Sequence, residues 1–507
     1  MNANEIYETV VDCLNKCVEE LNEKRRSIQD IIGIGITNQR ETTIAWDRET
    51  GKPLAPAIVW SDARTADDVV KFIQLAPESK PNAFQHITGL PIHSYFSAVK
   101  MNWLLSHIEA VIKANEDNRL LFGTVDSWLV WKLTNHACHV TDVTNASRTL
   151  LFNLHTLEWD EKLCQFFHIN PRTLPNVISS AELVGVIQDT NCLMKTWTSL
   201  TSVDDSLSDI SGVKITYGTG AFMLWNIGSQ PFFSDKGVLT TIAYQIGPKA
   251  KPHYALEGAV SYAGATMKWL KTKLEVFKDY ENLRNWLHLF SKNKTNISKA
   301  DLIYAGLRSS VYQTYDVMLV ATLAQTDRRR HSHTPLITLE KPKEIIVDGG
   351  MSNSSVLMQS LADVLNMTVK RHNHSNVMTA LGVAIVVALT LKIDPSGLLK
   401  LRQYTDEQDQ QQSIFHPRID SKHRDIMLTG WYASVKRSLN WTIDEQEITS
   451  KSTFFNLLKH IYNEQSLNED NMVKKQRFPL KSVEKFSIGV AAIGLLILGI
   501  LIGRRIR

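Results

Sequence analysis

The feature that most constrains the fold is a pattern found in both halves of this 507-residue chain: strand-like apolar runs, glycine-containing turns and helices follow one another. In the first half, the apolar run IIGIGITN (31–38) follows an amphipathic helix predicted over 4–24. In the second half, three strand-like runs (214–228, 238–247 and 253–260) precede helices predicted over 300–322 and 354–365. The pattern predicts mixed α/β domains in which helices pack on sheets.

Composition and charge narrow the classes of function. The chain is long enough for two or three domains, and its formal net charge of +4 predicts no nucleic-acid partner. The five cysteines show no paired spacing, and no apolar signal segment begins the chain, which indicates a reducing compartment without disulfides. No His and Cys spacing resembles a metal site, so we predict no metal-binding side chains of this kind.

The last part of the chain differs from the rest. The segment FSIGVAAIGLLILGILIG (486–503) carries no charged residue and is followed by Arg504, Arg505 and Arg507. About 20 apolar residues span a bilayer, so we predict a transmembrane tail anchor here, joined to the domains by a polar tether over 446–485. A buried core helix is the alternative. We expect the anchor to hold the chain on a cytosol-facing membrane, and arginines behind a short apolar tail suit the mitochondrial outer membrane.

Candidate chemistry begins where the run 31–38 ends. Arg40 and Glu41 place a cation and a carboxylate side by side, where both could hydrogen-bond adjacent hydroxyls of a polyol. An ordinary ion pair at a strand end is the alternative. The glycine turns 218–220 and 349–350 are of the kind that lets backbone N–H groups approach phosphate, although such short turns are also common without any ligand.

A longer set of blocks carries a resemblance to a known family. The chain resembles the FGGY carbohydrate kinases, and within them the glycerol kinases, over most of residues 4–445. The blocks that carry it are ITNQRETT, IVWSDART, GLPIHSYFSAVK, FGTVDSWLVWKLT, TDVTNASRTLLFN, YGTGAF, YALEGAV and VDGGMSNSSVLMQ. The resemblance implies two actin/hexokinase-like (ribonuclease H-like) α/β domains, an N-terminal substrate domain at 1–202 and a C-terminal nucleotide domain at 203–445.

The resemblance also implies an activity and its residues. It implies ATP-dependent phosphorylation of glycerol to glycerol 3-phosphate with Mg²⁺, in a homodimer or homotetramer. Arg40, Glu41 and Tyr95 are then expected to recognise hydroxyls. Trp60 and Phe222 are expected to flank the carbon backbone of glycerol. The residues expected at the nucleotide are Thr219, Gly220, Gly350 and Ser354.

The chain departs from the family pattern in whole blocks. An Asp-Gln-Gly-Thr hairpin expected ahead of the helix 4–24 is not visible, so we expect the first domain to be incomplete and the run 31–38 to have an unpaired edge. The interval SLTSVDDSLSDISGV (199–213) stands where the family has its catalytic aspartate. Asp204, Asp205 and Asp209 are candidate bases there, but their surroundings are Ser-rich and loop-like, which leaves the catalytic residue unassigned. The stretch KNKTNISKADL (292–302) replaces an expected aromatic and glycine-rich block of the second domain.

Two hypotheses follow from these departures. The first is an active glycerol kinase whose written sequence lacks some blocks. The second is a catalytically inactive, membrane-tethered relative that acts by binding or scaffolding.

Overall fold

The computed structural model describes most of the chain up to Ser438. The described residues are 1–27, 31, 33–187, 197–199, 212–234, 237–273, 275, 310–314, 316–318, 321, 342, 344–371, 375, 378–396 and 413–438. They divide between two compact units, of which the first comprises Met1–Ala265 and Gln313–Arg418. The tether 446–485 and the predicted membrane helix 486–503 lie outside the described residues. Across the described ranges, no helix has both the length and the apolar character needed to cross a membrane.

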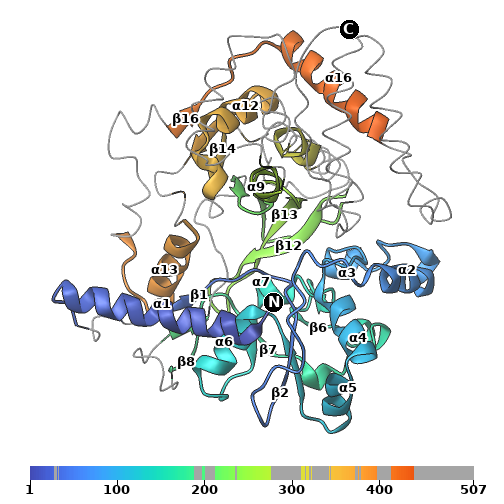
Figure 1. Cartoon of the computed structure of the whole chain (residues 1–507), viewed down its shortest axis with the longest axis vertical. Helices are drawn as coiled ribbons and strands as arrows, with labels where there is room; N and C mark the ends of the chain where they lie inside the picture. Colours follow the sequence, from blue (N-terminus) through green and yellow to red (C-terminus); the bar gives the residue numbers. More distant parts are fainter. Residues whose placement is uncertain are drawn as a thin grey trace, which may run out of the picture. The chain divides into compact units, whose positions relative to one another are not determined.

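The chain opens on helix α1 (Ala3–Glu23), which confirms the helix predicted over 4–24. Asn2 caps it, because its side-chain oxygen accepts a hydrogen bond from the backbone N–H of Asn4 at 3.0 Å. Its buried face packs on α6 (Val125–Leu133), where the indole Nε1 of Trp128 donates to the carbonyl of Ala3 at 2.9 Å (Figure 1). A buried amphipathic face therefore stabilises this long helix.

Short helices and strands follow α1 up to residue 187. The other helices of this stretch are α2 (Ala66–Leu75), η2 (Pro77–Ser79), α3 (Gln85–Thr88), α4 (Ser97–His107), α5 (Glu109–Glu116), α7 (Val143–Ala146), α8 (Glu161–Phe166) and η3 (Pro171–Thr173). The strands are β1 (Gly35–Ile36), β2 (Ile44–Asp47), β3 (Leu120–Gly123), β4 (Val140–Asp142), β5 (Phe152–Asn153), β6 (Glu158–Trp159), β7 (Asn176–Ile178) and β8 (Glu182–Gly185). Strand pairs β2–β3 and β5–β6 are antiparallel, whereas β4–β7 is parallel.

Strand β1 has a strand partner along one edge, and the unpaired edge expected for the run 31–38 is confined to its other side in the described residues. It pairs in parallel with β9 (Trp197–Ser199), and the sheet order is β1-β9-β8. Helix α13 (Met378–Thr390) covers β1, since a Cβ added to Gly33 would lie 2.7 Å from a side-chain carbon of Val387. A later strand and a later helix therefore protect the apolar run 31–38, although β1 remains terminal in this sheet.

The second half is built on a seven-stranded sheet with the order β12-β13-β11-β10-β14-β15-β16. The strands are β10 (Val213–Tyr217), β11 (Ala221–Gly228), β12 (Leu239–Tyr244), β13 (His253–Val260), β14 (Glu344–Asp348), β15 (Thr368–Arg371) and β16 (Ile414–Phe415). The predicted run 214–228 is two strands, because Gly218 donates its N–H to the carbonyl of Gly220 at 2.8 Å and turns the chain into a hairpin. β14 pairs in parallel with both β10 and β15.

Helices complete the second half. The 3-10 helix η5 (Gly350–Asn353) leads into α12 (Ser355–Leu365), which confirms the helix predicted over 354–365. Most of the helix predicted over 300–322 lies outside the described residues. In the second unit, which comprises Thr266–Tyr312 and Ile419–Arg507, the described helices are α16 (Ser421–Ser438) and most of α9 (Gly264–Thr272). The rings of Tyr312 and Trp431 stack there with centroids 5.3 Å apart.

Candidate active site

Arg40 and Glu41 lie in a turn between β1 and β2 rather than on a strand. Glu41 has a φ of 62°, a left-handed conformation that is uncommon for a residue with a side chain. Its carbonyl oxygen accepts hydrogen bonds from Lys100 Nζ at 3.1 Å and Ser97 Oγ at 3.3 Å. These donors hold a strained backbone in place, which is typical of a functional turn.

Four charged side chains meet beside this turn, and three of them are buried, whereas Arg40 is 17% exposed. Arg148 donates from Nε to Glu41 Oε1 at 2.6 Å, and its Nη2 lies 3.0 Å from Glu257 Oε1. Arg40 donates from Nη2 to Glu257 Oε2 at 2.9 Å. Arg148 and Glu257 are fully buried, and Glu41 is 3% exposed. The two guanidinium groups and two carboxylates balance in charge, and we call these four residues the charge network.

The charge network favours the ionised forms of Arg148 and Glu257 in spite of their burial. Burial opposes the charge of Arg148, but the carboxylates of Glu257 and Glu41 raise its pKa above the usual value. Burial likewise works against ionisation of Glu257, yet Arg148 and Arg40 hold its pKa below the usual value. Arg148 and Glu257 are therefore charged at neutral pH.

Aromatic rings form a wall next to the charge network. The Trp60 ring lies 5.7 Å from the ring of Tyr95 and 5.7 Å from that of Phe222, in edge-to-face geometry both times. The guanidinium of Arg148 sits 5.3 Å from the centroid of Tyr95. Burial, followed by the Glu41 carboxylate, raises the pKa of the Tyr95 hydroxyl well above its usual value, so this group is a neutral donor at neutral pH.

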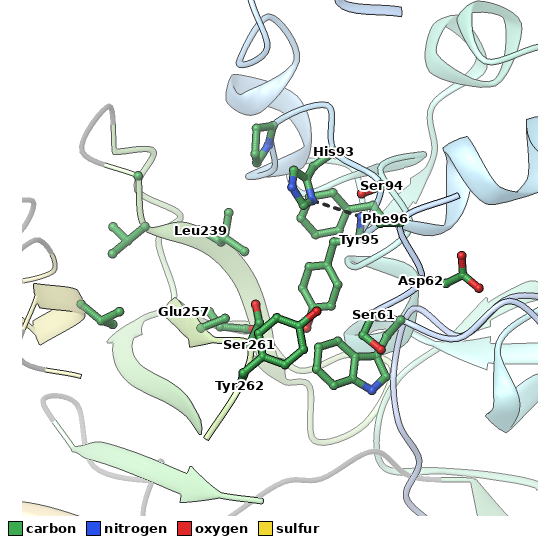
Figure 2. Close-up of a pocket in the computed structure, with 18 of the residues that line it drawn as sticks. Ser61, Asp62, His93, Ser94, Tyr95, Phe96, Leu239, Glu257, Ser261 and Tyr262 are labelled. Carbon is green, nitrogen blue, oxygen red and sulfur yellow. Dashed lines mark hydrogen bonds between the residues drawn. The ribbon is translucent and has the colours of Figure 1, made fainter. Parts of the chain in front are cut away.

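A cavity of about 620 Å³ opens against this wall. Trp60, Tyr95 and Glu257 line it, and Figure 2 shows Tyr95 entering from the segment before α4 and Glu257 from β13. Arg40, Glu41 and Phe222 are not among its lining residues. Arg40 contacts Glu257 and Phe222 contacts Trp60, whereas Glu41 is linked to the wall through Arg148, which lies over the ring of Tyr95. The structure thus brings the five residues predicted for a polyol into one place.

Lys100 bonds to the backbone of two of these residues, Glu41 and Tyr95. It is fully buried on α4, and its Nζ donates to the carbonyls of Tyr95 at 2.5 Å and Glu41 at 3.1 Å. Burial lowers the pKa of Lys100 to about 8 in spite of the carboxylates of Glu41 and Asp62. One side chain therefore fixes the backbone of both predicted hydroxyl-recognising residues.

The two glycine turns lie on neighbouring parallel strands of the seven-stranded sheet. Thr216 of β10 is in register with Asp348 of β14, so the turns that follow these strands lie at the same end of the sheet. Gly349 has a φ of 87°, and a Cβ there would lie 2.3 Å from the carbonyl oxygen of Tyr217. Only glycine allows this approach.

Three of the four predicted nucleotide residues belong to these turns. Thr219 and Gly220 form the hairpin turn after β10, and Gly350 begins η5. The carbonyl of Thr219 accepts hydrogen bonds from Ala263 N and Ala265 N, each at 3.0 Å. Ser354 is different, because its hydroxyl caps α12 by accepting from Leu357 N at 3.4 Å. What this position offers an anion is thus the N-terminus of α12, where the helix dipole favours negative charge.

The sequence analysis did not select Arg148, Glu257 or Lys100. Each is a charged residue inside a resembling block, and Glu257 interrupts the apolar run YALEGAV. A charge in a buried strand must be paired, and that signal could have identified it. The candidate bases Asp204, Asp205 and Asp209 lie outside the described residues, as does the stretch 292–302.

Comparison with protein families decides the affiliation. The model "FGGY family of carbohydrate kinases, N-terminal domain" matches residues 1–209, and the corresponding C-terminal domain matches 213–297 and 288–391. The chain belongs to the FGGY family of carbohydrate kinases. Its two-domain actin/hexokinase-like α/β fold is that of this family.

Individual FGGY relatives are similar along most of their length. A probable glycerol kinase of Caenorhabditis elegans is 33% identical over 470 residues, which cover 87% of this chain and 91% of the relative. A glycerol kinase of Haemophilus influenzae is 34% identical over 476 residues, with 88% and 90% covered. The crystal structure of Plasmodium falciparum glycerol kinase with ADP superimposes with a TM-score of 0.72 at 29% identity, covering 87% of this chain and 90% of that one. A ligand-bound xylulose kinase of Lactobacillus acidophilus, at 17% identity and a TM-score of 0.62, shows the fold alone.

Proposed function

We propose that this chain transfers the γ-phosphoryl group of ATP to glycerol and forms glycerol 3-phosphate. The observation that carries the proposal is the charge network beside the aromatic wall of Trp60, Tyr95 and Phe222. A small polyol offers hydroxyls to charged donors and acceptors and a carbon backbone to aromatic rings. The relatives named as glycerol kinases support the same substrate.

Each residue has a role in this proposal. Arg40 and Glu41 hydrogen-bond adjacent hydroxyls of glycerol, and the neutral Tyr95 hydroxyl donates a further hydrogen bond. Trp60 and Phe222 pack on the carbon backbone and exclude water. Because Lys100 and Arg148 hold Glu41 and Tyr95 in place, little conformational freedom is lost when glycerol binds.

ATP is proposed to bind at the glycine turns. Thr219, Gly220 and Gly350 would present backbone groups to the phosphates, and Ser354 would approach the nucleotide from the N-terminus of α12. The similarity to P. falciparum glycerol kinase, whose crystal structure contains ADP, supports a nucleotide here. We propose that the substrate domain covers residues 1–202 and the nucleotide domain residues 203–445. Both glycine turns then belong to the nucleotide domain.

We propose that Mg²⁺ binds mainly through the phosphates of ATP. The described residues contain no group of three or more His, Cys, Asp or Glu side chains that could hold a metal. Mg²⁺ is often held by one or two carboxylates together with substrate phosphates. Asp348 could supply one carboxylate, because its Oδ1 is buried without a hydrogen-bond partner in the described structure while Lys214 lies 2.9 Å from Oδ2. When bound, the ion neutralises charge on the transferred phosphoryl group.

One observation favours an alternative, a catalytically inactive relative that binds glycerol. Phosphoryl transfer uses a carboxylate that accepts the proton of the attacking hydroxyl. Glu41 and Glu257 are each ion-paired to arginines, and Glu257 has a lowered pKa, which makes it a poor base. The alternative predicts glycerol binding without turnover.

Two measurements on the purified, folded chain test the proposal. Calorimetry with glycerol tests the binding site, and an ATP-dependent assay for glycerol 3-phosphate tests the reaction. Binding with turnover supports the kinase, and binding without turnover supports the alternative. If glycerol does not bind and no product forms, both functions are wrong.

We further propose that the apolar segment 486–503 anchors the chain to a cytosol-facing membrane, with the mitochondrial outer membrane as the candidate. Its length and lack of charge support this. Deleting 486–507 should release a fluorescently tagged chain from membranes, and unchanged location would contradict the anchor. We also propose a homodimer or homotetramer, which light scattering of the purified chain tests directly.

A further inference from the structure

Glu257 connects the two family domains at the polyol site. It lies on β13 within the C-terminal family domain, in register with Leu224 of β11 and Leu239 of β12. Its carboxylate contacts Arg40 and Arg148, which both belong to the N-terminal family domain. A fully buried carboxylate on a strand of a sheet is costly, and two arginines offset that cost here.

The charge network contains donor and acceptor atoms that make no hydrogen bond in the described structure. Within the described structure, Arg148 Nη1 and Nη2 and Glu257 Oε1 are buried without hydrogen-bond partners. Arg148 Nη2 and Glu257 Oε1 are 3.0 Å apart, so they attract each other as charges, but no hydrogen bond joins them. Such groups are rare in proteins and call for a partner. Glu257 also lines the cavity.

A hydroxyl group suits this spare bonding capacity. It can donate a hydrogen bond to a carboxylate oxygen and accept one from a guanidinium N–H at the same time. A methyl group at the same place would leave both atoms unsatisfied. The site is therefore built to distinguish a hydroxyl from a hydrogen or methyl substituent, which a buried polar pair does strongly.

We propose that Glu257 is a specificity-determining residue of the polyol site. Its Oε1 accepts a hydrogen bond from one substrate hydroxyl, while its Oε2 holds Arg40 toward the others. Arg148 is a positioning residue, because it fixes Glu41, Tyr95 and Glu257 together. The inference rests on the proposed function, since it concerns recognition of the same polyol. It makes hydroxyl recognition depend on both family domains.

The test compares glycerol with two diols. Calorimetry measures the affinity of the unmodified chain and of the Glu257→Gln variant for glycerol, propane-1,2-diol and propane-1,3-diol. Losing a hydrogen bond to a charged group should weaken glycerol binding by about 10- to 100-fold. The diol that lacks the recognised hydroxyl should be affected much less, so the preference for glycerol over that diol should shrink. A purely structural defect would weaken all three ligands alike and leave the preferences unchanged.

Two further variants separate recognition from folding. Glu257→Asp keeps the charge but shortens the side chain, so it should melt within a few degrees of the unmodified chain and still lose about tenfold in glycerol affinity. If Glu257→Gln does not fold, this variant decides alone. Glu344→Gln is the matched control, because Glu344 is also on a strand and ion-paired to Lys370 at 2.6 Å, but is half exposed. It should bind glycerol as the unmodified chain does.

The outcomes for this inference and for the proposed function differ. If the unmodified chain does not bind glycerol, the proposed function fails before any variant is compared. If it binds glycerol, and folded Glu257→Gln and Glu257→Asp bind all three ligands with unchanged affinities, Glu257 has no part in recognition. Turnover is not needed for any of these measurements, so the catalytically inactive alternative is tested equally well.

Discussion

The proposed polyol site and the proposed nucleotide site differ in which part of the chain forms them. On the polyol side, side chains carry the chemistry, and charged groups from three separate segments meet beside aromatic rings. On the nucleotide side, backbone carries it, and glycines let two turns come close together. A side-chain site should fail through lost charge balance, whereas a backbone site should fail through steric strain. The predictions below test that difference.

Removing a charge from the polyol side should have the largest effect on stability. Arg148→Met removes the ion-pair partner of Glu41 in the charge network and leaves Glu257 there with Arg40 alone. Breaking a buried ion pair in this way should lower the free energy of unfolding by about 3–5 kcal/mol. Urea denaturation measures it. Lys370→Met, which breaks the partly exposed pair with Glu344, should cost less than about 1 kcal/mol. Equal losses in both variants would contradict the contrast.

A buried histidine of the first unit should make its stability sensitive to acid. His139 packs edge-on against Trp46 and donates from Nε2 to the carbonyl of Phe122 at 2.8 Å. Burial lowers the pKa of His139 to about 4 from a usual value of 6.5. Between these pH values the unfolded chain binds more protons than the folded one, so stability is full above pH 6.5 and falls as the pH drops to 4.

The loss from this histidine should reach roughly 3 kcal/mol at pH 4 or below. Denaturation curves at several pH values measure it. His139→Gln can still donate to Phe122 but cannot be protonated, so the difference in stability between this variant and the unmodified chain should shrink or reverse as the pH falls from 6.5 to 4. A difference that does not change with pH would show that His139 is not the titrating group.

The sequence predicted the parts of each site that lie within one short motif, but not the contacts between distant segments. Arg40 and Glu41 are neighbours in one short motif, so their meeting was predictable. Their partners Arg148 and Glu257 lie more than 100 residues away, and only the fold brings them together. The helix predicted over 354–365 is confirmed, and Ser354 caps its N-terminus. Because the Ser354 hydroxyl bonds to the helix, it is not free to face the nucleotide as expected.

Strand pairing was harder to predict for a related reason. The run 31–38 showed its apolar character but not its partner, and β9, more than 150 residues later, provides the pairing. The run 214–228 looked like one strand because the turn at Gly218 and Gly220 sits between two apolar stretches. Local sequence therefore predicted which segments were strands, whereas edges, hairpins and ion pairs depended on contacts between distant segments.

Adding one methyl group to the nucleotide side should cost less than breaking the charge network. Gly349→Ala places a Cβ 2.3 Å from the carbonyl of Tyr217 at a φ of 87°, so the turn must shift. The strain should lower the free energy of unfolding by about 1–3 kcal/mol and weaken binding of ADP. Thermal denaturation and ADP calorimetry measure the two effects. Gly350→Ala is the matched control for stability, because a Cβ there meets no atom within 4 Å.

The smallest expected effect comes from deleting a single oxygen on the polyol side. Tyr95→Phe keeps the ring that packs on Trp60 and under Arg148, so stability should change little. Glycerol affinity should fall by up to about tenfold, the usual range for one neutral hydrogen bond. Calorimetry measures it, and the effect should be the same at pH 6 and pH 9 because the raised pKa of Tyr95 keeps the hydroxyl protonated at both. An unchanged affinity would mean that Tyr95 contributes only its ring. The polyol side would then recognise hydroxyls through its charges alone, and the contrast with the backbone-built nucleotide side would become sharper.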